Sequence, residues 1–420
     1  MVKPFLNDEL SLVTDPDQDT TGAMNMAYWL LIVAAALVVG GLTMLYSASF
    51  NTAGLKFFRN QLIWVGAGVF GGGAAFLIGY RKLANASVVW MALSFILLMA
   101  ALCFPEVNGA NRWIRFRLPG LEMSLQPSEF AKIAVALFVA KYCADNMRTF
   151  NEWNNRRGIL PLAGVTGLVI LGILAGRDLG TTVLVGSMAT LTLLAAGLWK
   201  RYILVPIAFA VLIGTYIFFH DPTRVARVTS FLRPEEVQST SGYQLWNSLL
   251  AFGSGGWNGI GFMESRLKAK YLPEAHTDFI LAIVGEELGL IAMLAVIVAY
   301  AVFAVCALKI SLRSHSRLGM LLGFALTLGI VLQAAINMTV VIGVAPTKGM
   351  PAPFISYGGS NMMATLIAVG ILVSIAADTA EPGYNERYRN SLRRKLSFLP
   401  WFRQSVSYTH LRAHETLSDL

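Results

Sequence analysis

Ten apolar runs, each long enough to cross a lipid bilayer, occupy most of this sequence and restrict its fold more than any other feature. A backbone inside lipid must satisfy its own hydrogen bonds, and an α-helix does so within one segment. The sequence therefore predicts an all-α, polytopic integral membrane protein with about ten transmembrane helices. The predicted spans lie near residues 27–47, 61–79, 83–104, 127–145, 159–175, 179–198, 202–219, 278–308, 318–342 and 359–377.

Composition supports this class of protein. Hydrophobic residues make up 55% of the 420 residues and charged residues only 14%, whereas soluble domains carry about 25% charged residues. The formal charge of +9 raises the question of nucleic-acid binding. Because the basic residues gather in short loops and in the tail, orientation in the membrane and contact with membrane lipids explain this charge better. We expect no nucleic-acid partner.

Basic loops predict which side of the membrane each segment occupies. An even number of helices places both termini on the side of these loops, which is the cytoplasmic side. The predicted organisation is a cytoplasmic segment at 1–26, a membrane domain at 27–377 and a basic cytoplasmic tail at 378–404. Residues 405–420 break with what precedes them and are interpreted as a non-native or read-through tail. The loop residues are Arg81, Lys82, Arg148, Arg156, Arg157, Lys200, Arg201, Lys309, Arg313 and Arg317.

Three larger loops lie on the opposite, outer side, at residues 105–126, 220–277 and 343–357. The second connects the seventh and eighth predicted helices and is by far the longest. A long ordered loop in a compact protein is usually functional. We therefore expect the chemistry of this protein at its outer face.

Asp278 ends the longest loop at the point where the chain becomes apolar. Ionisable residues at membrane depth are costly and are functional candidates by default, which also draws attention to Glu286 and Glu287. On a continuous helix from Asp278, Glu286 lies about 12 Å further along and about 80° round, and Glu287 lies on the opposite side. The alternative is that Asp278 only caps the helix.

Other candidates lie on the same predicted face. Glu129 and Lys132 are three residues apart on the fourth helix, so they share a face and form a predicted pair. An ion pair that only makes the burial of both charges tolerable is the alternative. Arg112 lies in the first outer loop and Lys348 in the third. Ser356 follows Lys348, but no His/Asp pattern accompanies it, so a serine hydrolase is not indicated.

The glycine-rich stretch 253–261 superficially resembles a phosphate-binding loop. Neither a preceding strand nor a following Gly-Lys-Ser/Thr supports a nucleotide site. We expect these glycines to let the backbone pack closely beside the bundle. The cysteines, Cys103, Cys143 and Cys306, are far apart and suggest neither a disulfide framework nor a zinc site, and no metal site is predicted.

Several of these motifs together resemble the SEDS family, the shape, elongation, division and sporulation proteins. They occur in collinear order from about residue 26 to 377, and the PTKG motif and polar N-terminus resemble the division member more than the elongation member. Two positions depart from the family pattern: Gly176–Arg177 stand where Pro usually precedes Asp178, and Asn361 replaces a second serine after Ser360. The motifs are NGANRWIRF, QPSEFAK, DLGT, GYQ, YLPEAHTDFI, GEELG and PTKG…FISYGGS.

The resemblance implies a glycosyltransferase that polymerises lipid II, the undecaprenyl-diphosphate-linked disaccharide pentapeptide, into β-1,4 glycan strands. It further implies septal synthesis at the outer face of the bacterial inner membrane. Asp278 is the expected base, and the fixed cations expected for the leaving diphosphate are Arg112, Lys132 and Lys348. The predicted substrate-binding set also includes Glu129, His276 and Ser356.

No cofactor is certain on this resemblance, and a divalent cation, Mg²⁺ or Mn²⁺, is a candidate. The expected partners are a class B penicillin-binding protein with transpeptidase activity, other divisome proteins and membrane lipids. Two alternatives remain open: a lipid II flippase and a division scaffold without chemistry of its own. A flippase predicts a charged path across the whole membrane, whereas the motifs here gather on one face.

Overall fold

The computed structural model describes residues 16–106, 109–118, 121–153, 155–199, 201–202, 242–270, 272, 275–347 and 349–396, with single positions at 212, 215, 231, 235 and 237. Lys348 therefore lies outside the described residues, as do the tail at 405–420 and most of the seventh predicted span.

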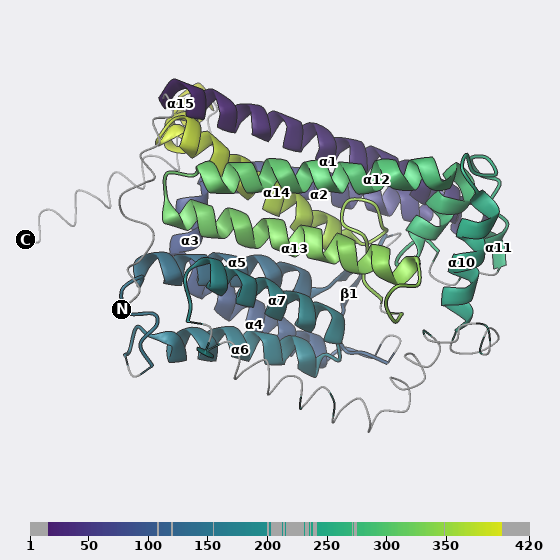
Figure 1. Cartoon of the computed structure of the whole chain (residues 1–420), viewed down its shortest axis with the longest axis horizontal. Helices are drawn as coiled ribbons and strands as arrows, with labels where there is room; N and C mark the ends of the chain where they lie inside the picture. The colour runs from purple at the N-terminus through teal and green to yellow at the C-terminus, as the bar shows by residue number, and fades with distance from the viewer. Residues whose placement is uncertain are drawn as a thin grey trace, which may run out of the picture.

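The prediction of an all-α, polytopic protein is confirmed. Long helices run side by side along the length of the molecule (Figure 1). In the part of the chain that is described, five helices are long and apolar enough to cross a membrane, and three shorter apolar helices accompany them. The helices are α1 (Pro16–Ala53), α2 (Lys56–Ile78), α3 (Tyr80–Asn85), α4 (Ser87–Leu102), α5 (Pro127–Asp145), α6 (Ile159–Ala175), α7 (Leu179–Ala195), α10 (Tyr243–Gly255), α11 (Leu267–Lys270), α12 (Ile280–Arg313), α13 (Arg317–Val341), α14 (Gly359–Ala380) and α15 (Tyr384–Leu396).

The structure differs from the predicted organisation in the following elements, among others. Helix α1 begins at Pro16, inside the segment expected to precede the membrane domain. The third predicted span is divided into α3 and α4 at Ala86. The first outer loop forms an antiparallel hairpin, β1 (Ile114–Leu118) and β2 (Leu121–Leu125). The sequence between these strands is Pro-Gly, which is typical of turns.

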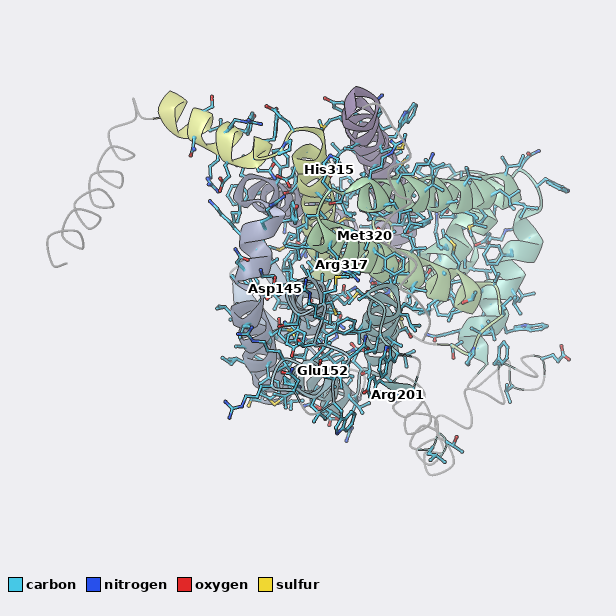
Figure 2. All side chains as sticks on the ribbon, turned by 60° about the vertical axis from the view of Figure 1, so that its left-hand side comes forward. Asp145, Glu152, Arg201, His315, Arg317 and Met320 are labelled. Atoms are coloured by element: carbon cyan, nitrogen blue, oxygen red, sulfur yellow. The ribbon has the colours of Figure 1, made fainter. Side chains whose placement is uncertain are left out.

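The predicted basic loops meet at one end of the bundle, here called the basic end. Arg81 forms an ion pair with Asp378 at 2.8 Å, and Tyr80 bonds to Ser316 at 2.8 Å. Arg317 donates to the carbonyl of Ala196. Figure 2 turns this end forward and labels Arg317 among its charged side chains. The convergence of these loops agrees with their prediction as one side of the membrane.

Helices α5, α13 and α14 supply much of the buried core. Pro127 occupies the first turn of α5, where its missing N–H removes no helical bond. Both Glu129 and Lys132 lie on this buried helix, close to the end opposite the basic one. The hairpin, α10 and α11 lie at that opposite end (Figure 1), here called the Asp278 end.

Candidate active site

Asp278 lies just outside helix α12, in a turn that is partly exposed to solvent. The helix begins at Ile280, with Phe279 at its N-cap position. Asp278 therefore precedes the N-cap position, and the angles calculated for a helix continuous from Asp278 do not apply. The main-chain carbonyl of Asp278 accepts a 2.8 Å hydrogen bond from Asn337 on α13.

The third outer loop approaches Asp278 closely at Gly349. A Cβ atom at Gly349 would lie 2.6 Å from Oδ2 of Asp278, so a larger residue would collide with the carboxylate. The next carbonyls, of Met350 and Pro351, accept hydrogen bonds from Asn337 and Gln333. Because Asn337 and Gln333 both lie on α13, the loop and the main chain of Asp278 are held by the same helix.

His276 belongs to the same end of the molecule. Its ring stacks on Phe57 of α2 with centroids 4.4 Å apart, and its carbonyl accepts a 3.0 Å bond from the N–H of Tyr357. Ser356 is 2% exposed, and its hydroxyl accepts the N–H of Ala352 at 2.7 Å. His276 thus lies two residues from Asp278 in the same turn, whereas Ser356 holds the third loop in shape.

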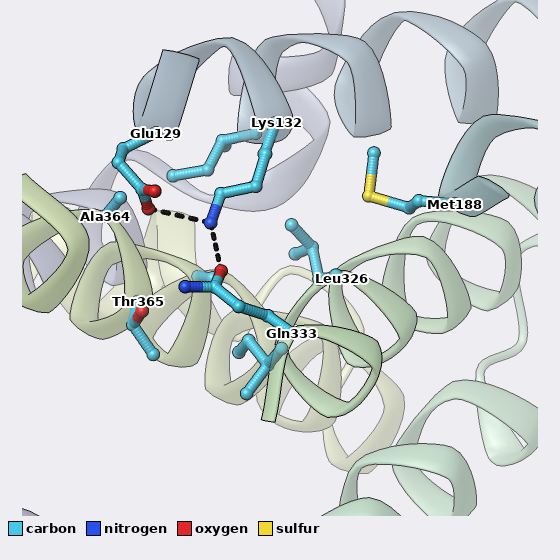
Figure 3. Close-up of a pocket in the computed structure, with 11 residues that line it drawn as sticks. Glu129, Lys132, Met188, Leu326, Gln333, Ala364 and Thr365 are labelled. Atoms are coloured by element: carbon cyan, nitrogen blue, oxygen red, sulfur yellow. Dashed lines mark hydrogen bonds and ion pairs between the residues drawn. The ribbon is translucent and has the colours of Figure 1, made fainter. Parts of the chain in front are cut away.

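The predicted pair of Glu129 and Lys132 is confirmed. The carboxylate and ammonium groups are 2.7 Å apart and buried, and Lys132 also donates to Gln333 (Figure 3). Asn361 donates to Glu129 at 2.7 Å, so the residue that departs from the family pattern joins this network. A cavity of about 20 Å³ beside the pair is large enough for about one water molecule and too small for a sugar or a diphosphate.

Substitution of this pair is expected to show coupling. Glu129→Ala or Lys132→Ala alone leaves a buried charge without its partner. The stability lost in the double variant should therefore be smaller than the sum of the losses in the two single variants. Thermal unfolding of both single variants and the double variant measures the interaction. Additive shifts in melting temperature would contradict it.

Arg112 lies beside a second buried carboxylate. Its Nη1 atom is 3.6 Å from Oδ1 of Asp178, which is 3% exposed. Asp178 caps α7 and accepts bonds from the N–H and hydroxyl of Thr181 and from the side chain of Gln126. Arg112 is consequently a fixed cation, with its guanidinium anchored where α5 and α7 begin.

Arg177, the other departure from the family pattern, connects α6 to α7 with a left-handed φ of 59°. It is exposed, and its guanidinium lies 3.4 Å from the carboxylate of Glu106 in the first outer loop. This residue therefore ties that loop to the α6–α7 turn.

Helix α12 is broken at Gly289, which has φ 75° and ψ −173°. The N–H groups of Ile260 and Gly261 donate to the carbonyls of Glu286 and Glu287. On the other side of the break, Leu290 and Ile291 donate to carbonyls of the same glycine-rich stretch. The backbone of the long outer loop thus completes the hydrogen bonding of the helix.

The glycines permit this close approach, as predicted. A Cβ atom at Gly259 would lie 2.1 Å from the carbonyl oxygen of Glu287, and one at Gly255 would lie 1.9 Å from that of Gly285. Neither position can carry a side chain without moving the backbone. The glycine-rich stretch is therefore a packing element.

Glu286 and Glu287 bind residues 263–268, which follow the glycine-rich stretch in the sequence. Lys268 forms a 2.7 Å ion pair with Glu287, and both side chains are buried. Ser47 of α1 donates to Glu287, and Ser265 donates its hydroxyl to Glu286. These carboxylates, flagged in the sequence as possible functional groups, join three separate segments.

Sequence reasoning did not select Asp178, Lys268, Gln333 or Asn337. Gln333 and Asn337 carry a usable signal, because two amides four residues apart in an apolar helix share one face and need partners. Asp178 has one too, since Asp directly before an apolar run is a preferred residue at a helix N-cap. Lys268 gives no local signal of burial.

The fold and the site together define an integral membrane protein whose polar chemistry is gathered at one end of a helix bundle. The chain belongs to the FtsW, RodA and SpoVE family of cell cycle proteins, which matches residues 26–381. The SEDS resemblance of the motifs is thereby confirmed.

Its relatives include named enzymes. The chain is 37% identical to the probable peptidoglycan glycosyltransferase FtsW of Trichlorobacter lovleyi, over 83% of this chain and 92% of that protein. It is 34% identical to stage V sporulation protein E of Bacillus subtilis, over 83% of this chain and 96% of that protein.

Solved structures share the fold. One, described as the structural coordination of polymerization and crosslinking by a peptidoglycan synthase complex, gives a TM-score of 0.70 at 24% identity and covers 84% of this chain and 98% of its own. Rod shape determining protein RodA of Thermus thermophilus gives 0.61 at 23% identity, over 83% of this chain and 96% of its own.

Proposed function

We propose that this protein is a peptidoglycan glycosyltransferase that polymerises lipid II into β-1,4 glycan strands during septal cell-wall synthesis. The observation that carries the proposal is the Asp278 carboxylate, partly exposed beside Gly349 and backed by a buried polar network. The curated relatives are named as enzymes of this class.

The reaction requires a base. A sugar hydroxyl of one molecule attacks the anomeric carbon of the other, and Asp278 accepts the hydroxyl proton as the new bond forms. The bond to the lipid diphosphate breaks at the same carbon, so an α-linked donor gives a β-linked product. Asp278 lies in a turn before α12, so a substrate can reach its carboxylate from the Asp278 end.

The leaving diphosphate requires fixed positive charge. Arg112 fits this role, because one side of its guanidinium faces Asp178 and its side chain remains 26% exposed. Lys348 is the second proposed cation. Lys132 is 9% exposed and already contacts Glu129 and Gln333. We therefore propose that Lys132 and Glu129 act indirectly, by holding Gln333, which binds the third outer loop.

A divalent cation, Mg²⁺ or Mn²⁺, is a candidate cofactor. Within the described ranges no group of three metal-ligating side chains occurs. The single carboxylate of Asp278 fits such an ion, since Mg²⁺ commonly uses one or two carboxylates together with substrate phosphates. Bound there, it would supply charge neutralisation for the diphosphate.

The proposed setting follows from the same orientation. The basic end faces the cytoplasm together with both termini, and the Asp278 end faces outward at the division septum of the inner membrane. A class B penicillin-binding protein is the proposed partner for crosslinking, with other divisome proteins beside it. A structural neighbour described as a peptidoglycan synthase complex supports a partner of this kind.

The flippase alternative is tested with lipid II already present on the outer face of proteoliposomes. We expect wild-type protein with its partner to form polymer there, and Arg112→Ala or Lys348→Ala to lower turnover about tenfold to 100-fold, because each removes a charge-assisted contact. Arg115→Ala is the matched control: it changes an exposed arginine of β1, three residues after Arg112.

Gel-resolved glycan products from labelled lipid II measure the result. Absence of polymer, together with Lys348-dependent movement of lipid II between leaflets, would establish the flippase in place of the enzyme. A scaffold would give neither polymer nor movement.

A further inference from the structure

Helix α13 presents two buried amide side chains on one face, Gln333 and Asn337. They are four residues apart, and each is 1% exposed. Burying an amide without hydrogen-bond partners costs about 1–3 kcal/mol in proteins. The retention of two such groups in an apolar helix is therefore explained by what they bind.

Asn337 bridges two segments that are distant in sequence. Its Nδ2 atom donates to the carbonyl of Asp278 at 2.8 Å and to the carbonyl of Met350 at 2.6 Å. These two bonds use both hydrogens of the amide. Its Oδ1 atom is buried without a hydrogen-bond partner. The orientation that lets the amide donate to both carbonyls therefore leaves its own oxygen unpaired.

Gln333 extends the same attachment by one turn of the helix. Its Nε2 atom donates to the carbonyl of Pro351 at 2.9 Å, and its Oε1 atom accepts from Lys132. Lysine can only donate, so its contact fixes which end of the amide faces the loop. The ion pair of Lys132 and Glu129 thereby sets the orientation of Gln333.

The two amides hold the loop where it meets the carboxylate. Gly349, next to Met350, lies so close to Oδ2 of Asp278 that a Cβ atom would be 2.6 Å away. A shift of the loop by about 1 Å would change the space around that oxygen. Such a displacement can lower an enzymatic rate about 100-fold.

We infer that Asn337 and Gln333 are positioning residues that hold Asp278 and the Gly349–Pro351 segment at a fixed separation for glycosyl transfer. This inference rests on the proposed role of Asp278 as base. Neither amide is inferred to touch the substrate. Asn337 holds the main chain of Asp278 directly, and Gln333 holds the loop that lies against it.

The test uses full-length protein in nanodiscs with its partner and labelled lipid II. Asn337→Leu keeps the approximate volume and removes both donors, and Gln333→Met does the same for the second amide. We expect kcat to fall about 10-fold to 100-fold for each, with KM nearly unchanged. The double variant should lose less than the product of the two single losses, because both act on one loop.

Thr327→Val is the matched control. Thr327 is 2% exposed on the same helix, and its hydroxyl bonds only to the Gly323 carbonyl within α13. This variant removes a buried hydrogen bond without touching the loop. We expect wild-type kcat and KM from it.

Hydrogen exchange provides a readout that does not depend on activity. Backbone amides in 275–282 and 349–357 should exchange faster in Asn337→Leu and Gln333→Met, and remain unchanged in Thr327→Val. Faster exchange with wild-type kcat would overturn the inference, and so would unchanged exchange. An active Asp278→Asn variant would instead refute the proposed base, and the exchange result would still decide whether the amides hold the loop.

Discussion

Replacing Asp278 by Asn is expected to lower glycan polymerisation by about 10²–10⁴-fold, which is the usual contribution of a general base. The amide side chain is close in size to the carboxylate and cannot accept the proton of the attacking hydroxyl. Since Asn337 binds the main-chain carbonyl of Asp278, the substitution leaves that attachment intact. Labelled glycan products resolved on a gel measure the effect.

The matched control for this experiment is Glu264→Gln, which neutralises an exposed carboxylate of the same outer loop. It should polymerise normally. Asp278→Asn should also fold, insert and bind lipid II, because the proposed cations remain. Glycan ladders of near-normal length from Asp278→Asn would remove it from the mechanism.

Lys268→Met is expected to destabilise the protein by about 3–5 kcal/mol. The ammonium group is fully enclosed, 2.7 Å from Glu287, and also bonds to Ser47 and to the carbonyl of Met263. Its removal leaves Glu287 buried in a site with no compensating cation among the described contacts. Thermal unfolding in nanodiscs is the measurement.

Adding Glu287→Gln to Lys268→Met should recover part of the loss, because the stranded charge is removed with its partner. Arg387→Met is the control: it breaks an exposed ion pair with Glu381 at the basic end and should change stability by less than about 1 kcal/mol. If Lys268→Met is no more costly than Arg387→Met, the buried pair does not hold the loop.

Local patterns predicted those features of the site that depend on nearby residues. The pair of Glu129 and Lys132 follows from helical spacing, and the close packing of the glycine-rich stretch follows from its lack of side chains. Asp278 was selected because charge is costly at the edge of a membrane helix. Each of these inferences needs no knowledge of distant segments.

Contacts between distant segments were beyond such reasoning. The partners of Glu287 are Ser47 on α1 and Lys268 in the outer loop. Nothing in the local sequence of these residues indicates that they meet. The break at Gly289 was missed because the apolar pattern continues through it. Only the loop backbone, which replaces the missing helical bonds, makes that conformation stable.

The break at Gly289 also bears on how the protein is made. The part of α12 before the break, Ile280–Leu288, is about 13 Å long and too short to cross a bilayer, whereas the part after it, Leu290–Arg313, extends about 36 Å and is long enough. Insertion by the translocon can therefore be completed by the second part alone. The first part, with its two carboxylates, can pack against the glycine-rich loop in a later step, so crossing the membrane does not require the Asp278 end to be formed first.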